Sequence, residues 1–201
     1  MSVSAAEVKA LRDRTGAAMM DCKAALSESE GDVDRAIEIL RVKGQASAAK
    51  REGRGTSEGV VASYVHANDR VGAMVEVQCE TDFVARNEDF KAFAYEVALH
   101  VAATAPTYVT ADEIPAEERE AEKRVFEEKA REDGKPDNVV EKIVEGQLAK
   151  WAKDVALLDQ AHVNADKHDS KSIEELRQEL AAKTGENIRV ARFSYFRVGE
   201  Q

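Results

Sequence analysis

The residue types in this sequence that could perform covalent or metal chemistry are present, but their spacing supports little of it. None of the four histidines stands in an HExxH or HxH arrangement, and Cys22 and Cys79 belong to no CxxC pair or Cys/His cluster. Such spacings are typical of structural zinc sites and of metalloprotease helices. Glycine-rich phosphate-binding sequences of the GxxxxGK[S/T] and GxGxxG kinds are also missing. We therefore expect no catalytic centre, metal site or cofactor, and a chain that is not an enzyme.

A short corner between a predicted strand and a predicted helix is the strongest candidate for a functional contact. It places a carboxylate, Asp82, beside a large aromatic residue, Phe83, and is flanked by Thr81 and Val84. In one interpretation Thr81 caps the turn, Asp82 favours the helix N-terminus, and Phe83 folds into the core. In the other, Phe83 points outward as a wedge. A third idea, an acid–base pair of Glu80 and Asp82, is weak because residues at i and i+2 do not converge.

A pair of adjacent methionines, Met19 and Met20, is the second candidate. Neighbouring residues on a helix point in different directions, so one methionine must turn away from the core that takes the other. Exposed methionine suits an adaptable binding surface. The alternative is that both side chains fill gaps in a very small core.

The elements around these candidates predict an α+β fold. Residues 1–44 read as a three-helix bundle, with a capping box at Ser4 and Glu7 and a cap at Asp32. β-Branched runs at 60–66 and 71–79 predict a hairpin, and residues 187–198 a final strand. The helices predicted between these strands and after them pack on the small antiparallel sheet, giving an α+β core domain over 58–201.

Residues 45–57 change character and are predicted to form a linker or a frayed helix end. Gly53 and Gly55 loosen this segment, while Lys50, Arg51 and Arg54 make it basic. An RNA-binding function would have to rest on these three residues. The cluster is short and lacks interleaved aromatic residues, so we do not favour that function.

Composition narrows the function classes further. The 201 residues include 39 acidic and 29 basic side chains, for a net charge of −10. Nucleic-acid binding needs a basic surface, so we expect no direct nucleic-acid contact. No apolar run approaches the roughly 18 residues of a membrane span, and the charged N-terminus is unlike a signal peptide. With two distant cysteines, these features predict a cytoplasmic protein without membrane association.

Several runs resemble the bacterial translation elongation factor Ts family. The run KALRDRTGAAMMDCK at 9–23 resembles the N-terminal signature of that family, and ETDFVARN at 80–87 resembles its second signature. HVAA at 100–103, GKP at 134–136 and EG at 145–146 follow in the same order. The ordered set covers nearly the whole chain and is far more specific than any single run.

The resemblance implies a guanine-nucleotide exchange factor for elongation factor Tu. It implies that the N-terminal module is similar to a ubiquitin-associated domain, and that the corner displaces Mg²⁺ from the partner. The implied corner residues are Thr81, Asp82, Phe83 and Val84. The implied contacts of the N-terminal module and the core are Arg12, Met19, Met20, Lys23 and His100.

The chain departs from longer members of the family in its length. Those members carry two core subdomains and a coiled-coil insertion, whereas this chain is long enough for one core and is expected to lack the insertion. The final strand has apolar residues on both faces, including Phe193, Tyr195 and Phe196. A strand covered on one side alone does not need them, so we expect a homodimer in which a second copy supplies the missing half.

Overall fold

The computed structural model describes residues 3–200, with the backbone alone at residues 45, 137 and 138. The chain forms two compact units, and each is described by itself. The first unit holds the residues up to Ala62, Glu76–Tyr95 and Glu175–Val190. The second unit holds Ser63–Val75, Glu96–Glu174 and the residues from Ala191 onward.

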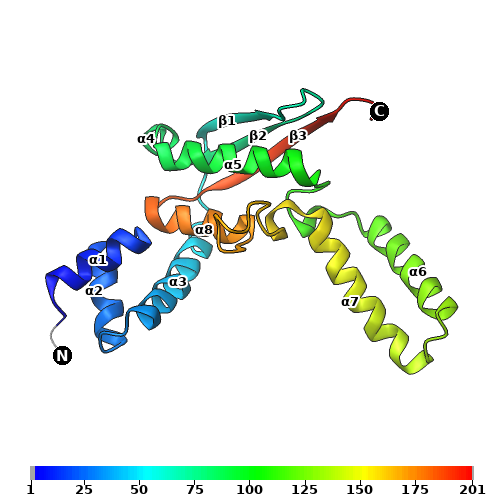
Figure 1. Ribbon diagram of the computed structural model, residues 1–201, viewed down its shortest axis with the longest axis horizontal. Helices are drawn as coiled ribbons and strands as arrows, with labels where there is room; N and C mark the ends of the chain where they lie inside the picture. Colours follow the sequence, from blue (N-terminus) through cyan, green and yellow to red (C-terminus); the bar gives the residue numbers. More distant parts are fainter. Residues whose placement is uncertain (1–2, 201) are drawn as a thin grey trace. The chain divides into compact units, whose positions relative to one another are not determined.

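Three helices form the N-terminal bundle of the first unit: α1 (Ala5–Thr15), α2 (Met19–Glu28) and α3 (Val33–Ala49) (Figure 1). Their apolar faces meet in a small core, as the helical spacing of these residues predicts. The buried members of this core are Val8, Leu11, Cys22, Ala25, Leu26, Ala36 and Leu40. The bundle thus buries residues from all three helices.

The helix starts expected in this bundle are confirmed, but one helix end is wrong. Ser4 and Glu7 form the reciprocal capping box, and Asp32 accepts a hydrogen bond from the backbone N–H of Arg35 at 3.0 Å. Helix α3 continues through Gly44 to Ala49, because Gly44 lies against α8 (Ile173–Thr184), where an added Cβ would be 3.3 Å from Ala182. Glycine is kept here for close packing and not as a helix stop. Of the segment predicted to be a linker or a helix end, residues 45–49 belong to α3, and residues 50–57 form neither helix nor strand.

The sheet has three antiparallel strands in the order β1 (Glu58–Val65), β2 (Val71–Cys79) and β3 (Arg189–Arg197). The hairpin between β1 and β2 is confirmed, since the N–H of His66 donates to the Val71 carbonyl at 2.8 Å. The N–H of Val198 donates to the carbonyl of Arg70 at 2.9 Å, which sets the register of β3 against β2. Both outer strands therefore pair with β2.

Short connections after β2 and before β3 create the corner. A one-turn helix, α4 (Asp82–Ala85), follows β2 and leads into α5 (Glu88–Thr104). Helix α8 (Ile173–Thr184) leads into β3 through a turn at Gly185, which has a φ of 76°. In the first unit, β2 buries Val77 and Cys79, and β3 buries Val190. Phe90, in the first turn of α5, is fully buried as well.

Two long helices in the second unit, α6 (Ala116–Glu132) and α7 (Asp137–Val155), pack against each other as a helical hairpin (Figure 1). Ala130, Val140 and Val144 form its buried core, and Gly134 makes the turn with a φ of 68°. Helices were predicted between the hairpin and the final strand, and α6 and α7 are confirmed; the structure adds that they pair with each other. The many charges of this segment lie on its exposed surface, and its apolar seam is narrow. Among residues 3–200, no helix is both long and apolar enough to cross a membrane.

Candidate partner-binding surface

The corner segment, residues 81–84, exposes its aromatic ring. Thr81 is the N-cap of α4, and its side-chain oxygen accepts a hydrogen bond from the Val84 amide at 3.4 Å. Ala85 is buried beneath the turn, whereas 81% of Phe83 is exposed. The interpretation of Phe83 as a core residue is therefore wrong. A large apolar side chain held at a surface corner is suited to insertion into another molecule.

The carboxylates around the corner have separate partners. Asp82 pairs with Arg86 one turn later, with 3.0 Å between carboxylate and guanidinium; the Arg86 side chain is largely exposed and the Asp82 side chain is about half exposed. Glu80 accepts a hydrogen bond from the backbone N–H of Asn187 at 2.6 Å. An exposed pair such as Asp82–Arg86 contributes about 0–1 kcal/mol, so Asp82 can exchange partners readily. The two carboxylates do not form an acid–base pair.

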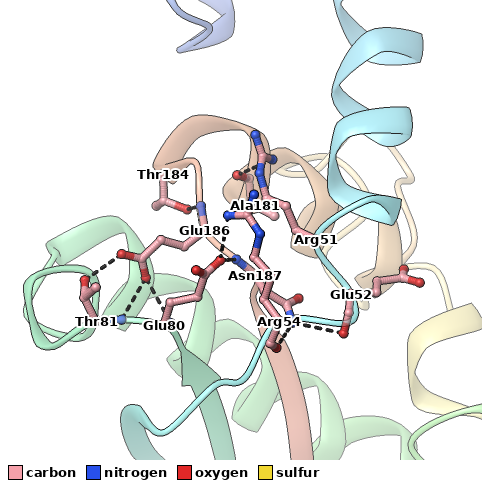
Figure 2. Close-up of polar contacts among 9 residues, drawn as sticks. All are labelled: Arg51, Glu52, Arg54, Glu80, Thr81, Ala181, Thr184, Glu186 and Asn187. Carbon is pink, nitrogen blue, oxygen red and sulfur yellow. Dashed lines mark hydrogen bonds and ion pairs between the residues drawn. The ribbon is translucent and has the colours of Figure 1, made fainter.

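Polar contacts tie the corner to the segment that follows α3 and to the turn before β3. Figure 2 shows Glu186 directed at the backbone around Thr81, and Asn187 directed at residues 52–54. Arg54 contributes a 3.4 Å ion pair to Glu80, and Arg51 donates to the carbonyl of Ala181 at 3.4 Å. Two of the three basic residues considered for RNA binding are thus engaged within the chain.

The N-terminal residues implied by the resemblance are all exposed on α1 and α2. Met19 is 45% exposed and Met20 is 71% exposed, while Cys22 and Leu26 fill the core of the bundle. The interpretation of the methionine pair as core filler is therefore wrong for both residues. Arg12 and Lys23 are likewise exposed, so this part of the bundle presents apolar and cationic groups to solvent.

His100, by contrast, is completely buried in the second unit. Its Nε2–H donates to the side-chain oxygen of Gln160 at 2.8 Å, and its Nδ1 accepts from the backbone N–H of Val163 at 3.0 Å. Burial lowers the pKa of His100 to about 4, which keeps the ring neutral. The side chain has no surface to offer a partner, so any effect on partner binding must be indirect.

Glu96, His162 and His168 bring three potential metal-ligand atoms within 4.8 Å of one another. The hydrogen bonds in the cluster favour another role. Nδ1 of His162 accepts from the backbone N–H of Asn164 at 3.1 Å, so its Nε2 carries the proton that points toward Glu96. A metal-ligating histidine normally donates from its second nitrogen instead of accepting there. We read the group as a hydrogen-bonded cluster that fastens residues 162–168 to α5.

An apolar patch lies on one face of the sheet in the second unit. The strand register places Val65 and Phe196 on either side of Gly72, and Met74 lies two residues farther along β2 on the same face. Val65, Met74, Phe196 and the adjacent Val198 are each at least 50% exposed. We call these four residues the sheet patch. Scattered exposed apolar residues are ordinary, but four neighbours on one sheet face are typical of an interaction surface.

Sequence reasoning missed the residues that support the corner. Glu186 and Asn187 lie more than 100 residues from Glu80 and Thr81, and neither belongs to a run with a functional signature. The one local signal was the turn itself: Gly185 ends a helix just before a predicted strand. Such a signal predicts a chain reversal, but it does not reveal which backbone amides the next carboxylate will reach.

Comparisons with known proteins agree on one family. The family model described as elongation factor TS matches residues 23–169. The chain is 53% identical over 199 residues to an elongation factor Ts of Herpetosiphon aurantiacus, with 99% of each chain covered. It is 50% identical over 200 residues to an elongation factor Ts of Geobacter metallireducens, covering 100% of this chain and 91% of the relative. Because the family model matches most of the chain and these relatives align over nearly all of it, the chain belongs to the elongation factor Ts family.

Proposed function

We propose that this chain is the guanine-nucleotide exchange factor for elongation factor Tu in protein synthesis. In this function it binds the GDP-bound GTPase, displaces Mg²⁺, promotes GDP release and holds the nucleotide-free state until GTP binds. The observation that carries the proposal is the exposed ring of Phe83, at 81%, on a corner whose backbone is fixed by hydrogen bonds. Translation takes place in the cytoplasm, which is where we expect the chain to act.

Thermodynamic linkage defines what such a factor must do. An exchange factor leaves the intrinsic affinity of the free GTPase for GDP unchanged. It accelerates release by binding the nucleotide-free partner better than the GDP-bound partner, so factor and nucleotide weaken each other reciprocally. The contacts that matter are therefore those made more favourable when Mg²⁺ and GDP have left.

The magnitude of the effect requires more than one contact. A 10⁴-fold acceleration corresponds to lowering the barrier by about 5.5 kcal/mol. Burial of one phenylalanine side chain contributes about 1.5–3 kcal/mol. Phe83 therefore acts together with other surfaces, and the N-terminal bundle offers one through Arg12, Met19, Met20 and Lys23, all of them exposed.

The proposal divides the work between anchor and wedge. The N-terminal residues anchor the nucleotide-binding domain of the GTPase, and Phe83 inserts between elements on which the Mg²⁺ and phosphate contacts depend. Asp82, weakly held by Arg86, supplies negative charge or a hydrogen-bond acceptor beside the displaced segment. His100 contributes by supporting the packing of α5 and not by touching the partner.

The direct test is release of a fluorescent GDP analogue from elongation factor Tu in a stopped-flow instrument. We expect the rate to rise with the concentration of this chain and to saturate, while heat-denatured chain has no effect. Tight binding without faster release would contradict the exchange function. It would favour the alternative that the three-helix bundle is a binding module that recognises a peptide or a ubiquitin-like surface.

We further propose that the chain forms a homodimer through the sheet patch. A flat apolar face can pack on its own copy about a two-fold axis, which would cover Val65, Met74, Phe196 and Val198 in both copies. Sedimentation at micromolar concentration should then give a dimer. Met74→Glu should shift the mass to the monomer, because it buries a charge in each half of the interface, whereas Val125→Glu on α6 should not. A monomeric unaltered chain would contradict the proposal.

A further inference from the structure

We infer that Glu186 is a positioning residue for nucleotide exchange: its carboxylate fixes the backbone from which Phe83 projects. This inference rests on the exchange function proposed above. Glu186 is the second residue after α8 and immediately follows Gly185, whose φ of 76° turns the chain toward β2. The side chain thereby reaches a segment 105 residues away in the sequence.

The carboxylate of Glu186 binds the corner at three points. One oxygen accepts from the backbone N–H groups of Glu80 and Thr81, each at 3.0 Å. The other accepts from the hydroxyl of Thr81 at 2.6 Å (Figure 2). Hydrogen bonds to an ionised acceptor are shorter and about twice as strong as neutral ones.

The hydroxyl of Thr81 passes this constraint on to α4. Its single proton is donated to Glu186, so a lone pair is left to accept the Val84 amide at 3.4 Å. Glu186, Thr81 and the first turn of α4 therefore form one chain of hydrogen bonds. Because Phe83 lies within that turn, the direction of its side chain depends on where Thr81 is held.

Asn187, the next residue, makes further hydrogen bonds to the corner and to the segment that follows α3. The backbone N–H of Asn187 donates to Glu80 at 2.6 Å, and the buried side chain of Asn187 donates to the carbonyls of Glu52 and Arg54 at 3.3 and 2.9 Å. The turn before β3 thus binds both the corner and the segment that follows α3. Glu186 is the member of this group that contacts the corner at Thr81 itself.

The apolar contacts nearby explain why Glu186 should affect direction more than folding. Cys79 before the corner and Ala85 and Phe90 after it are buried, and they hold the end of β2 and the start of α5 in place. Residues 81–83 between them have no fully buried side chain. Without Glu186 the strand and helix should persist, while the turn that carries Phe83 gains alternative orientations.

The test compares Glu186→Ala, Glu186→Gln and a control, Glu128→Ala on the exposed surface of α6. For each, GDP release from elongation factor Tu is followed at increasing factor concentration, which gives a saturating rate and a half-saturating concentration. We expect Glu186→Ala to lower the saturating rate about tenfold with little change in thermal unfolding. Glu186→Gln should lose less, about threefold, because its amide can still accept both backbone N–H groups. The control should match the unaltered chain.

A double-mutant cycle with Phe83→Ala separates positioning from a general structural role. If Glu186 acts through the ring, Glu186→Ala should change the saturating rate by less than about twofold in the Phe83→Ala background. The same tenfold loss in both backgrounds would overturn the inference, as would a saturating rate unaffected by either substitution of Glu186. Should Glu186→Ala fail to fold, Glu186→Gln carries the cycle. If the unaltered chain does not accelerate release, the proposed function itself fails, which is a different result.

Discussion

Phe83 and His100 are both expected to matter for the partner, yet the structure treats them in opposite ways. Phe83 is 81% exposed on a one-turn helix, whereas His100 is fully buried one turn before the end of α5. Hydrogen bonds hold the backbone of Thr81 and Val84 on either side of Phe83, while the side chain of Phe83 is exposed. His100 has both ring nitrogens engaged, by Gln160 and by the amide of Val163.

Two residues that are both implied to affect the partner can therefore act in different ways, one through binding and the other through the stability of the free chain. An exposed ring can change the free energy of binding directly, because its burial occurs only in the complex. A buried ring has already been removed from water when the protein folds, so its contribution enters the stability of the free chain. Substitution of His100 should therefore change the free energy of unfolding, whereas substitution of Phe83 should change the rate of GDP release.

The largest expected effect is on stability, from His100→Ala. The change leaves a cavity and removes the acceptor of the Val163 amide, so we expect the free energy of unfolding to fall by about 2–4 kcal/mol. Urea unfolding measures this, and His66→Ala, at an exposed histidine, should change it by less than about 0.5 kcal/mol. Where the His100→Ala chain is still folded, its saturating exchange rate should lie within about twofold of normal. A large loss of rate in the folded variant would mean that buried and exposed residues act alike.

Phe83→Ala should lower the exchange rate and leave the stability of the chain unchanged. We expect the saturating rate of GDP release to fall about ten- to a hundredfold, since about 1.5–3 kcal/mol of burial is lost, while urea unfolding stays the same. Phe83→Leu, which keeps an apolar side chain, should fall in between. Tyr95→Ala, which removes a half-exposed ring from α5, is the matched control and should leave the rate unchanged. An unchanged rate for Phe83→Ala would contradict the wedge.

Local sequence signals predicted most of the fold. The capping box at Ser4, the cap at Asp32 and the hairpin after His66 all depend on residues close together in the chain, and all are confirmed. The end of α3 was missed, because Gly44 is disfavoured in an isolated helix but packs here against Ala182. The helices α6 and α7 were predicted, but their pairing was not, because the apolar seam between them is narrow among many charges.

The candidate site was less predictable because its supports are distant in the sequence. The order of Thr81, Asp82 and Phe83 indicates an unusual corner, but both directions of the ring are compatible with it. We infer that the direction of the Phe83 ring depends on Glu186, which lies 105 residues after Thr81 in the sequence. No spacing rule links Glu186 to Thr81. Likewise, the contact between His100 and Gln160 spans 60 residues. Contacts between residues far apart in the chain produce no local sequence pattern from which they could be predicted.

The buried histidines also predict how stability depends on pH. Burial lowers the pKa of His100 to about 4, and burial together with the neighbouring His168 lowers the pKa of His162. Between about pH 6.5 and 4 the unfolded chain therefore binds more protons than the folded chain, so stability falls as the pH falls. For His100 alone the loss from pH 7 to pH 5 is about 2 kcal/mol.

Glu96 extends this loss to lower pH. Burial acts to raise its pKa, but hydrogen bonds from Lys167 and His168 outweigh burial and leave the pKa below the ordinary value. Its stabilising contribution is present above about pH 4.5 and disappears as the pH falls further. Urea unfolding at several pH values measures both effects. His100→Ala should flatten the slope between pH 7 and 5, and His66→Ala should not. A slope that is identical in all three chains would mean that His100 is protonated as readily in the folded state as in the unfolded one.

The smallest expected effect concerns the anchor. Met20 is 71% exposed, and its loss should raise the dissociation constant for nucleotide-free elongation factor Tu about five- to tenfold, because a flexible thioether buries only part of its surface at an interface. Met19→Ala should have a smaller effect, since that side chain is less exposed in the free chain, and Val125→Ala on the exposed surface of α6 should have none. Calorimetry gives the constants, and stopped-flow release gives the saturating rate, which should stay within about twofold for Met20→Ala. A fall in the saturating rate with an unchanged constant would place Met20 with Phe83 as part of the wedge, so that anchor and wedge would no longer be separate regions.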